Sequence, residues 1–174
     1  PVGFPPGVAP RVVVGLGTTY QRQAPLLQTI LDAIARLDVR ALVSTSGVVD
    51  AESLQVPPNA AVTDYVPYAA VLGTADAIVT HAGLGTVAAA ASFGVPMVCT
   101  PISRDQPLNA ERVAAVGAGI ALAADANANA ADIARALERV TTESTFRDSA
   151  AALAAESAAE GGADAVVADL EALL

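Results

Sequence analysis

The sequence predicts an α/β protein built on a doubly wound, parallel sheet of six strands with helices on both faces. Short apolar runs rich in valine and isoleucine alternate along the chain with stretches of helical periodicity, an order of elements typical of this class. The runs are apolar at consecutive positions, as in strands that are buried on both faces of a parallel sheet. Parallel neighbours require right-handed crossover connections, which the helical stretches supply.

Each strand is predicted from a short apolar run that ends at a glycine, a turn or a polar residue. The six predicted strands span residues 11–17, 39–45, 60–63, 77–80, 96–100 and 120–122. The first helix is predicted over 24–37, because Leu27, Ile30, Leu31 and Ile34 recur at the spacing of one helix face.

The later helices are predicted in the same way. They span residues 68–72 (a single turn), 86–93, 107–116, 131–140, 144–159 and 164–174. Gly94 and Gly117 follow two of them, at positions where a left-handed residue commonly ends a helix. We therefore expect one domain over residues 11–174, closed by a terminal helix.

The first ten residues differ from the rest in composition. Residues 1–10 hold four of the eleven prolines, which is typical of a semi-rigid linker, here an interdomain linker. Because the chain lacks an initiator methionine and opens on this linker, we expect a further domain upstream.

Composition excludes several classes of protein. Of 174 residues, 53% are hydrophobic and 16% are charged, which excludes a disordered chain. Eighteen acidic residues against nine arginines and no lysine give a net charge of −9, so nucleic acid is not an expected partner. The longest apolar run, 113–124, is too short to span a membrane, and without a visible secretory signal we expect a cytoplasmic location. The single cysteine, Cys99, is expected to be buried and inert.

Two glycine-bearing loops mark the predicted ligand site. Ligands of doubly wound sheets bind where the strand order reverses, here between the first and fourth strands. These strands run into residues 15–19 (GLGTT) and 81–86 (HAGLGT). The second loop opens a helix, whose amino terminus carries about half a positive charge, and glycine lets backbone N–H groups approach a ligand. The pair predicts a phosphate site without lysine, the alternative being ordinary tight turns.

His81, the only histidine, ends the fourth strand beside the glycine turn. Its N–H could donate to a phosphate oxygen and help to neutralise a leaving anion. The alternative is a core histidine whose nitrogens are satisfied by the protein. A lone histidine brings no neighbouring ligands, so no metal site is expected. With the only histidine committed to the phosphate site, no Ser-His-Asp or Cys-His arrangement can be assembled, and no catalytic residue is assigned.

Polar residues also follow the fifth strand. Asp105 and Gln106 place a carboxylate beside an amide, groups suited to a polyhydroxylated ligand. The alternative is that Asp105 or Ser103 caps the next helix, which Pro107 in its first turn favours. Asn109, one turn later, is expected either to reach the same crevice or to be exposed.

Taken together, separated segments resemble the donor-binding signature of nucleotide-sugar glycosyltransferases of the GT-B fold, related to UDP-glycosyltransferases and macrolide glycosyltransferases. The segments are residues 65–67 (YVP), 77–86 (AIVTHAGLGT), 94–101 (GVPMVCTP) and 105–106 (DQ). They occur in the family's order and spacing, and the resemblance in motifs extends from residue 11 to about residue 119.

The resemblance implies a Rossmann-like half of a GT-B enzyme, namely the carboxyl-terminal domain that binds the nucleotide-sugar donor. A missing amino-terminal domain would bind a small-molecule acceptor and supply the base. The implied reaction is an inverting, metal-independent transfer of a hexose-type sugar from a UDP- or dTDP-sugar, with no cofactor. This chain alone would bind donor but transfer little.

Site residues follow from the resemblance by position. The diphosphate is expected at His81, Gly83, Gly85, Thr86, Gly17, Thr18 and Thr19. The nucleobase is expected at Tyr65, Val66 and Tyr68, and the sugar hydroxyls at Asp105 and Gln106.

Three positions depart from the family's pattern. Many relatives have tryptophan where this chain has Tyr65 and glutamine where it has Tyr68. Many UDP-sugar enzymes have a glutamate, which contacts the ribose, where this chain has Ala89. Alanine makes no such contact, so the nucleotide is expected either to be dTDP rather than UDP or to be bound less tightly. The alanine-rich, lysine-free composition is more similar to antibiotic-type bacterial enzymes than to those of plants or animals.

Other functions remain open at this point. A UDP-sugar epimerase shares the fold, and an isolated donor-binding module without transferase activity shares the site. A dehydrogenase is disfavoured, because the loop at 15–20 lacks the third glycine of the dinucleotide fingerprint.

Overall fold

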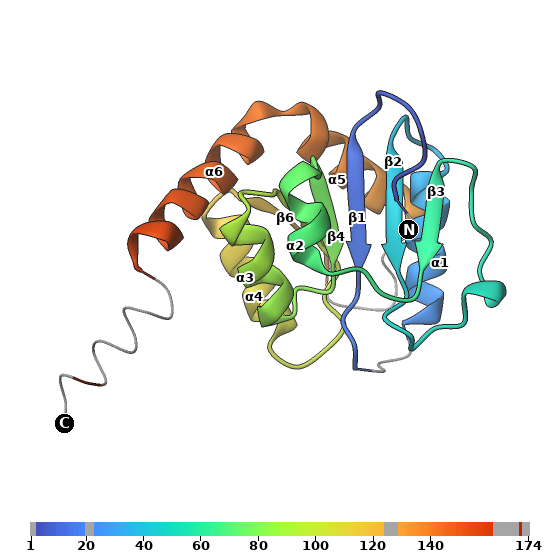
Figure 1. Ribbon diagram of the computed structural model, residues 1–174, viewed down its shortest axis with the longest axis horizontal. Coiled ribbons are helices and arrows are strands. Elements are labelled where there is room, and N and C mark those ends of the chain that lie inside the picture. Colours follow the sequence, from blue (N-terminus) through green and yellow to red (C-terminus); the bar gives the residue numbers. More distant parts are fainter. Residues whose placement is uncertain (1–2, 20–22, 124–128, 162–170, 172–174) are drawn as a thin grey trace.

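The structure, a computed structural model, describes residues 3–19, 23–123, 129–161 and residue 171. One sheet carries the fold, with its strands in the order β3-β2-β1-β4-β5-β6 (Figure 1). The strands are β1 (Arg11–Gly15), β2 (Arg40–Ser44), β3 (Ala60–Thr63), β4 (Ala77–Thr80), β5 (Met97–Cys99) and β6 (Gly119–Ala121). Every neighbouring pair is parallel. The predicted fold class is confirmed, and the order reverses between β1 and β4.

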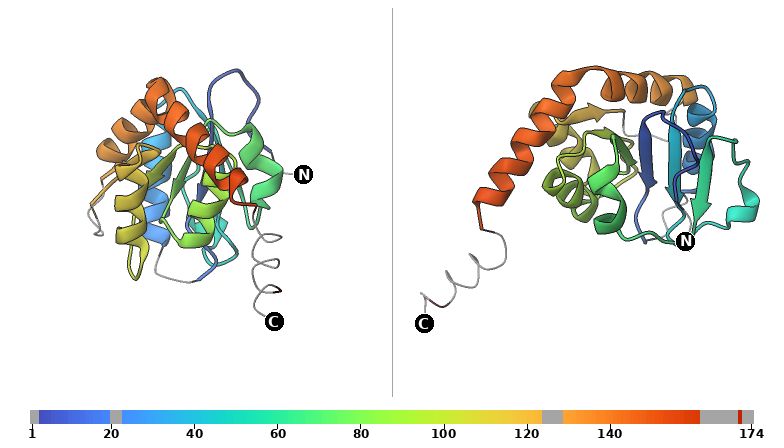
Figure 2. Two further views of the ribbon diagram at one scale, coloured as in Figure 1. Left: turned by 90° about the vertical axis from the view of Figure 1, so that its left-hand side faces the viewer. Right: turned by 45° about the horizontal axis from the view of Figure 1, so that its top comes forward.

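Helices cover both faces of this sheet (Figure 2). One face carries α1 (Ala24–Ile34) and α5 (Ala130–Thr142). The other carries α2 (Tyr68–Val71), α3 (Leu84–Ser92), α4 (Gln106–Ala115) and α6 (Ser144–Ala159). Short 3-10 turns lie at η1 (Ala51–Ser53) and η2 (Leu72–Thr74).

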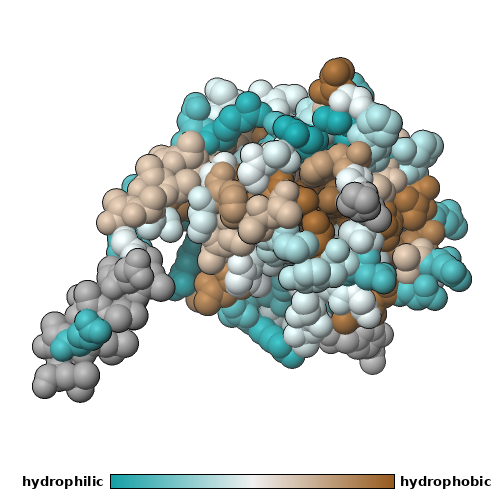
Figure 3. All heavy atoms as spheres, in the orientation of Figure 1, coloured by the Kyte–Doolittle hydropathy of each residue, from teal (hydrophilic) through white to brown (hydrophobic). Residues whose placement is uncertain are grey.

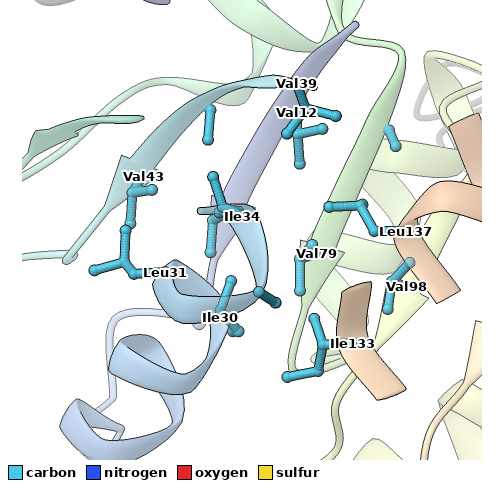
Figure 4. Packing of buried hydrophobic residues seen from close by; sticks show 14 of the residues in the cluster. Val12, Ile30, Leu31, Ile34, Val39, Val43, Val79, Val98, Ile133 and Leu137 are labelled. Carbon is cyan, nitrogen blue, oxygen red and sulfur yellow. The ribbon is translucent and has the colours of Figure 1, made fainter. Parts of the chain in front are cut away.

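The core forms two clusters because strand side chains alternate between the faces. Val12 and Val14 of β1 point to the α1 and α5 side, whereas Val13 points to the α3 and α4 side. Figure 4 shows the first cluster, in which strand valines meet Ile30 and Ile34 of α1 and the apolar side chains of α5. Because both faces of the sheet are covered, a ligand has access at the ends of the strands and the loops that follow them.

Several predicted boundaries differ from the structure by one to three residues, and two of these differences have a clear local reason. The first helix ends at Ile34 rather than at residue 37, since Asn59 Nδ2 donates to the carbonyls of Ile34, Leu37 and Val39 at 3.0–3.1 Å. The third begins at Leu84 rather than at residue 86. Gly83 is its N-cap, and the Gly83 carbonyl accepts from the N–H groups of Thr86 and Val87 at 3.0 Å.

At the amino-terminal end of the chain, the first described residues pack against the domain. In the segment predicted as a linker, Arg40 holds the carbonyls of Pro5 and Ala9 at 3.3 and 2.8 Å, and Phe4 packs against the second core cluster. The helix predicted over 164–174 lies, apart from Glu171, outside the described residues.

On the face shown in Figure 3, hydrophobic residues gather over the region of β1 and β2. Within the described ranges, no helix combines the length and apolar character that crossing a bilayer requires.

Candidate functional site

A pocket of about 370 Å³ opens where the carboxyl ends of β1, β2 and β4 meet the amino terminus of α3. Its lining residues are Gly17, Thr18, Thr19, Ser44, Ser46, Tyr65, Val66, Tyr68, His81, Gly83, Leu84, Gly85 and Thr86. The pocket thus brings together all ten residues expected at the diphosphate and the nucleobase. The two expected at the sugar, Asp105 and Gln106, are not in its lining.

The loop after β1 forms one wall of the pocket. Gly17 has a φ of +82°, a left-handed conformation that favours glycine. β1 therefore ends at Gly15 and not at the predicted residue 17. The buried Gln23 side chain stabilises the loop, because its Nε2 donates to the carbonyls of Leu16 and Thr19 at 3.2 and 2.9 Å. The exposed Thr18 hydroxyl is therefore presented on an ordered turn.

The opposite wall is the first turn of α3. The first N–H groups of a helix have no partner within it, and its amino terminus carries a partial positive charge. Here the first turn, Leu84 to Thr86, lines the pocket and contains no acidic residue. A Cβ at Gly85 would meet nothing within 4 Å, so this side of the pocket is open. The arrangement suits an anionic ligand.

His81 lies between the two glycine loops. A Cβ at Gly17 would lie 2.8 Å from His81 Nε2, and a Cβ at Gly83 would lie 2.5 Å from the same atom. Any larger residue at either position would force the imidazole to shift. The buried ring lines the pocket and its Nδ1 has no partner among the described residues, contrary to the alternative of a core histidine whose nitrogens are satisfied by the protein.

The environment of His81 favours its neutral form. Its side chain is buried, and among the described residues none completes a hydrogen bond to Nδ1. Burial lowers the pKa of His81 below its usual value, while the Gly15 backbone and the Asp105 carboxylate act in the opposite direction. The neutral ring keeps one N–H to donate, and a nearby anion would favour a second.

Tyr68 projects beneath the first loop. Its hydroxyl occupies the space where a Cβ at Gly15 would lie, and is 3.3 Å from Thr86 Oγ1. Burial raises the pKa of Tyr68, so the phenol stays protonated at neutral pH. The tyrosine joins the floor of the pocket to the first turn of α3.

Three residues that line the pocket were not predicted from the sequence as site residues: Ser44, Ser46 and Leu84. Ser44 ends β2, and its Oγ accepts from the Ser46 N–H at 3.3 Å and donates to the Asp64 carbonyl at 3.3 Å. A polar residue at the carboxyl end of a strand beside the switch point was a signal that could have found it.

The loop before α4 corrects two expectations. Asp105 is the N-cap residue, but its side chain makes no capping hydrogen bond, so the capping interpretation is wrong for it. The carboxylate instead accepts from Asn109 Nδ2 at 2.8 Å. Gln106 Oε1 accepts from the N–H groups of Ile102 and Ser103 at 2.8 and 3.0 Å, which stabilises the loop. Asn109 is neither exposed nor in the pocket lining.

Cys99 meets its expectation. It is fully buried in β5, and burial raises the pKa of its thiol to about 12, so it is inert.

The proteins most similar to this chain include glycosyltransferases, both by sequence and by structure. L-demethylnoviosyl transferase of Streptomyces niveus is 36% identical over 172 residues, covering 91% of this chain and 44% of that protein. The solved calicheamicin glycosyltransferase superposes with a TM-score of 0.86 at 28% identity, covering 97% of this chain and 44% of that one. A spinosyn rhamnosyltransferase complexed with thymidine diphosphate superposes at 0.74 and 26% identity, covering 87% and 42%.

The six-stranded parallel sheet is that of one Rossmann-like domain of a GT-B glycosyltransferase. The chain spans less than half the length of these relatives. Residues 28–173 match the family described as erythromycin biosynthesis protein CIII-like, C-terminal domain, and the chain belongs to that family.

Proposed function

We propose that this chain is the donor-binding domain of an inverting, metal-independent glycosyltransferase that transfers a hexose-type sugar to a small-molecule acceptor. The observation that carries the proposal is the convergence of the α3 amino terminus, the His81 imidazole and the threonine hydroxyls on one pocket. A nucleoside diphosphate has the negative charge and the oxygen acceptors that such donors bind.

The lining also supports metal independence. Its described residues include no carboxylate, the ligand type that Mg²⁺ prefers. In the proposed reaction, the charge of the diphosphate is therefore balanced by the helix dipole, backbone N–H groups and His81.

We propose dTDP ahead of UDP as the nucleotide. Ala89 of α3 packs against the second core cluster and offers no carboxylate to a ribose hydroxyl. The deoxyribose of dTDP has no 2′-hydroxyl, so dTDP loses less binding free energy than UDP when no carboxylate is present at position 89. The structural relative solved with thymidine diphosphate supports the same choice. Tyr65, 66% exposed at the pocket, is proposed to stack on the base together with Val66.

In the proposed mechanism, an acceptor hydroxyl attacks the anomeric carbon from the face opposite the diphosphate. The bond from this carbon to the diphosphate oxygen breaks, and the electron pair leaves with the diphosphate. Groups already fixed around the pocket stabilise this developing charge without reorganising. The hydroxyl proton passes to a base that we place on an amino-terminal acceptor domain.

The sugar hydroxyls are proposed to bind at Asp105 and Gln106. Since Gln106 Oε1 already accepts two backbone N–H groups, the carboxylate of Asp105 is the stronger candidate for a direct contact. Such contacts would orient the sugar for attack.

Calorimetric titration of the chain with dTDP, UDP and ADP tests the proposal. The pyrimidine diphosphates should bind, dTDP more tightly than UDP, and His81→Ala should weaken both. Joining an acceptor domain should then produce sugar transfer with inversion and without added metal. Equal binding of ADP, or affinity that does not change in His81→Ala, would contradict the proposed site.

A further inference from the structure

The peptide bond between Ala82 and Gly83 sets the direction of an N–H group at the pocket. In a trans peptide the C=O and the following N–H point in opposite directions, and none of the described peptide bonds is cis. The Ala82 carbonyl points into the protein, where Asn109 Nδ2 donates to it at 3.0 Å. The Gly83 N–H therefore points the other way, toward the pocket that Gly83 lines.

Ala82 adopts a conformation that has to be stabilised by its surroundings. Its φ is +63°, in the left-handed region that alanine rarely adopts, and its side chain is fully buried. Its N–H donates to Thr80 Oγ1 at 3.2 Å, and its carbonyl accepts from Asn109. Both backbone groups of Ala82 are thus held by buried side chains.

Asn109 is itself fixed in place. It lies on α4, its side chain is buried, and the same Nδ2 donates to Asp105 Oδ2 at 2.8 Å. The carboxylate orients the amide, and the amide holds the carbonyl of Ala82. This connects the loop after β5 with the loop after β4, although the two are more than twenty residues apart in sequence.

We infer that Asn109 is a positioning residue, whose buried amide holds Ala82 in the left-handed conformation and thereby aims the Gly83 N–H at the diphosphate of the ligand. The inference rests on the proposed function, because it assumes a nucleoside diphosphate in the pocket. It assigns Asn109 no contact with the ligand.

The test compares Asn109→Ala, the double variant Asn109→Ala/Ala82→Gly, and Asn59→Ala. Affinities for dTDP and for thymidine are measured by calorimetry and displacement, and thermal unfolding shows that each variant is folded. Asn59 is the matched control, since its Nδ2 also donates to backbone carbonyls but lies away from the pocket.

Asn109→Ala should weaken dTDP about fivefold to tenfold, the effect of one lost hydrogen bond, and thymidine by less than about twofold. Glycine at position 82 adopts a positive φ freely, so the double variant should regain much of the dTDP affinity. Asn59→Ala should lower the melting temperature without changing either affinity.

Different outcomes separate the inference from the proposed function. A wild-type chain that binds neither dTDP nor UDP overturns the proposed function and the inference with it. If the wild type binds, the inference alone is overturned by an unchanged dTDP affinity in Asn109→Ala, by an equal loss for thymidine, or by a double variant no tighter than Asn109→Ala.

Discussion

Gly83→Ala probes the fit between the glycine loop and His81. The backbone at Gly83 has a φ of −63° and a ψ of 140°, which any residue adopts, so alanine introduces no backbone strain. Its Cβ, however, would lie 2.5 Å from His81 Nε2 and 2.8 Å from Cε1. Restoring an ordinary contact of about 3.5 Å requires the ring edge to move by about 1 Å.

This displacement is large on the scale of a hydrogen bond. If His81 donates to the diphosphate at about 2.9 Å, a shift of about 1 Å breaks that bond. A hydrogen bond to a charged group contributes about 1.5–3 kcal/mol. We therefore expect Gly83→Ala to weaken dTDP binding by about 10- to 100-fold, with a small effect on stability because the pocket gives the ring room to move.

Calorimetry in two backgrounds isolates the steric cause. In His81→Ala the ring is gone, so adding Gly83→Ala should weaken dTDP by less than about twofold further. Thermal unfolding of the four proteins would confirm that each remains folded. The reasoning is refuted if Gly83→Ala weakens binding equally in both backgrounds, or leaves wild-type affinity unchanged.

Three further predictions concern stability and reactivity. Asn59→Ala removes three hydrogen bonds at the end of α1 and should cost about 1–2 kcal/mol, a fall in melting temperature of about 2–8 °C; an unchanged melting temperature would contradict the capping role. The pKa of His81 is lowered in the folded state, so the unfolded chain binds more protons, and stability should fall as the pH drops below about 6.5. In urea titrations, the free energy of unfolding of His81→Gln should fall less steeply with decreasing pH than that of the wild type. Equal pH dependence in the two proteins would refute the prediction. Cys99, with its pKa raised to about 12 and its side chain buried, should react with a thiol reagent at pH 8 only on unfolding; fast labelling of the folded chain would overturn this.

Much of the fold was predictable because its signals are local. The strands at 60–63 and 77–80 and the helix at 144–159 match the structure at both ends. The end of α1 was not predictable, because the residue that terminates it, Asn59, lies 25 positions beyond Ile34. Nothing in the local pattern indicates which carbonyl a turn asparagine will bind.

The candidate site was also predictable only in part. Ends of parallel strands meet at one edge, so the loops at Gly17 and Gly83 could be placed together from their positions alone. The interpretation of Asp105 as a helix cap used a correct local pattern, but Asn109 competed for the carboxylate. The role of Asn109 had no sequence signal, since its partner Ala82 belongs to another loop.

The amino-acid order by itself therefore determined the class of fold, the family resemblance and the two loops that form the pocket. Runs of valine and stops at glycine act over a few residues, and the topology of a parallel sheet then leaves few arrangements. Only the tertiary structure decided that His81 lies between two glycines and that Asn109 holds Ala82. These contacts depend on atomic distances between segments remote in sequence, which no local pattern encodes.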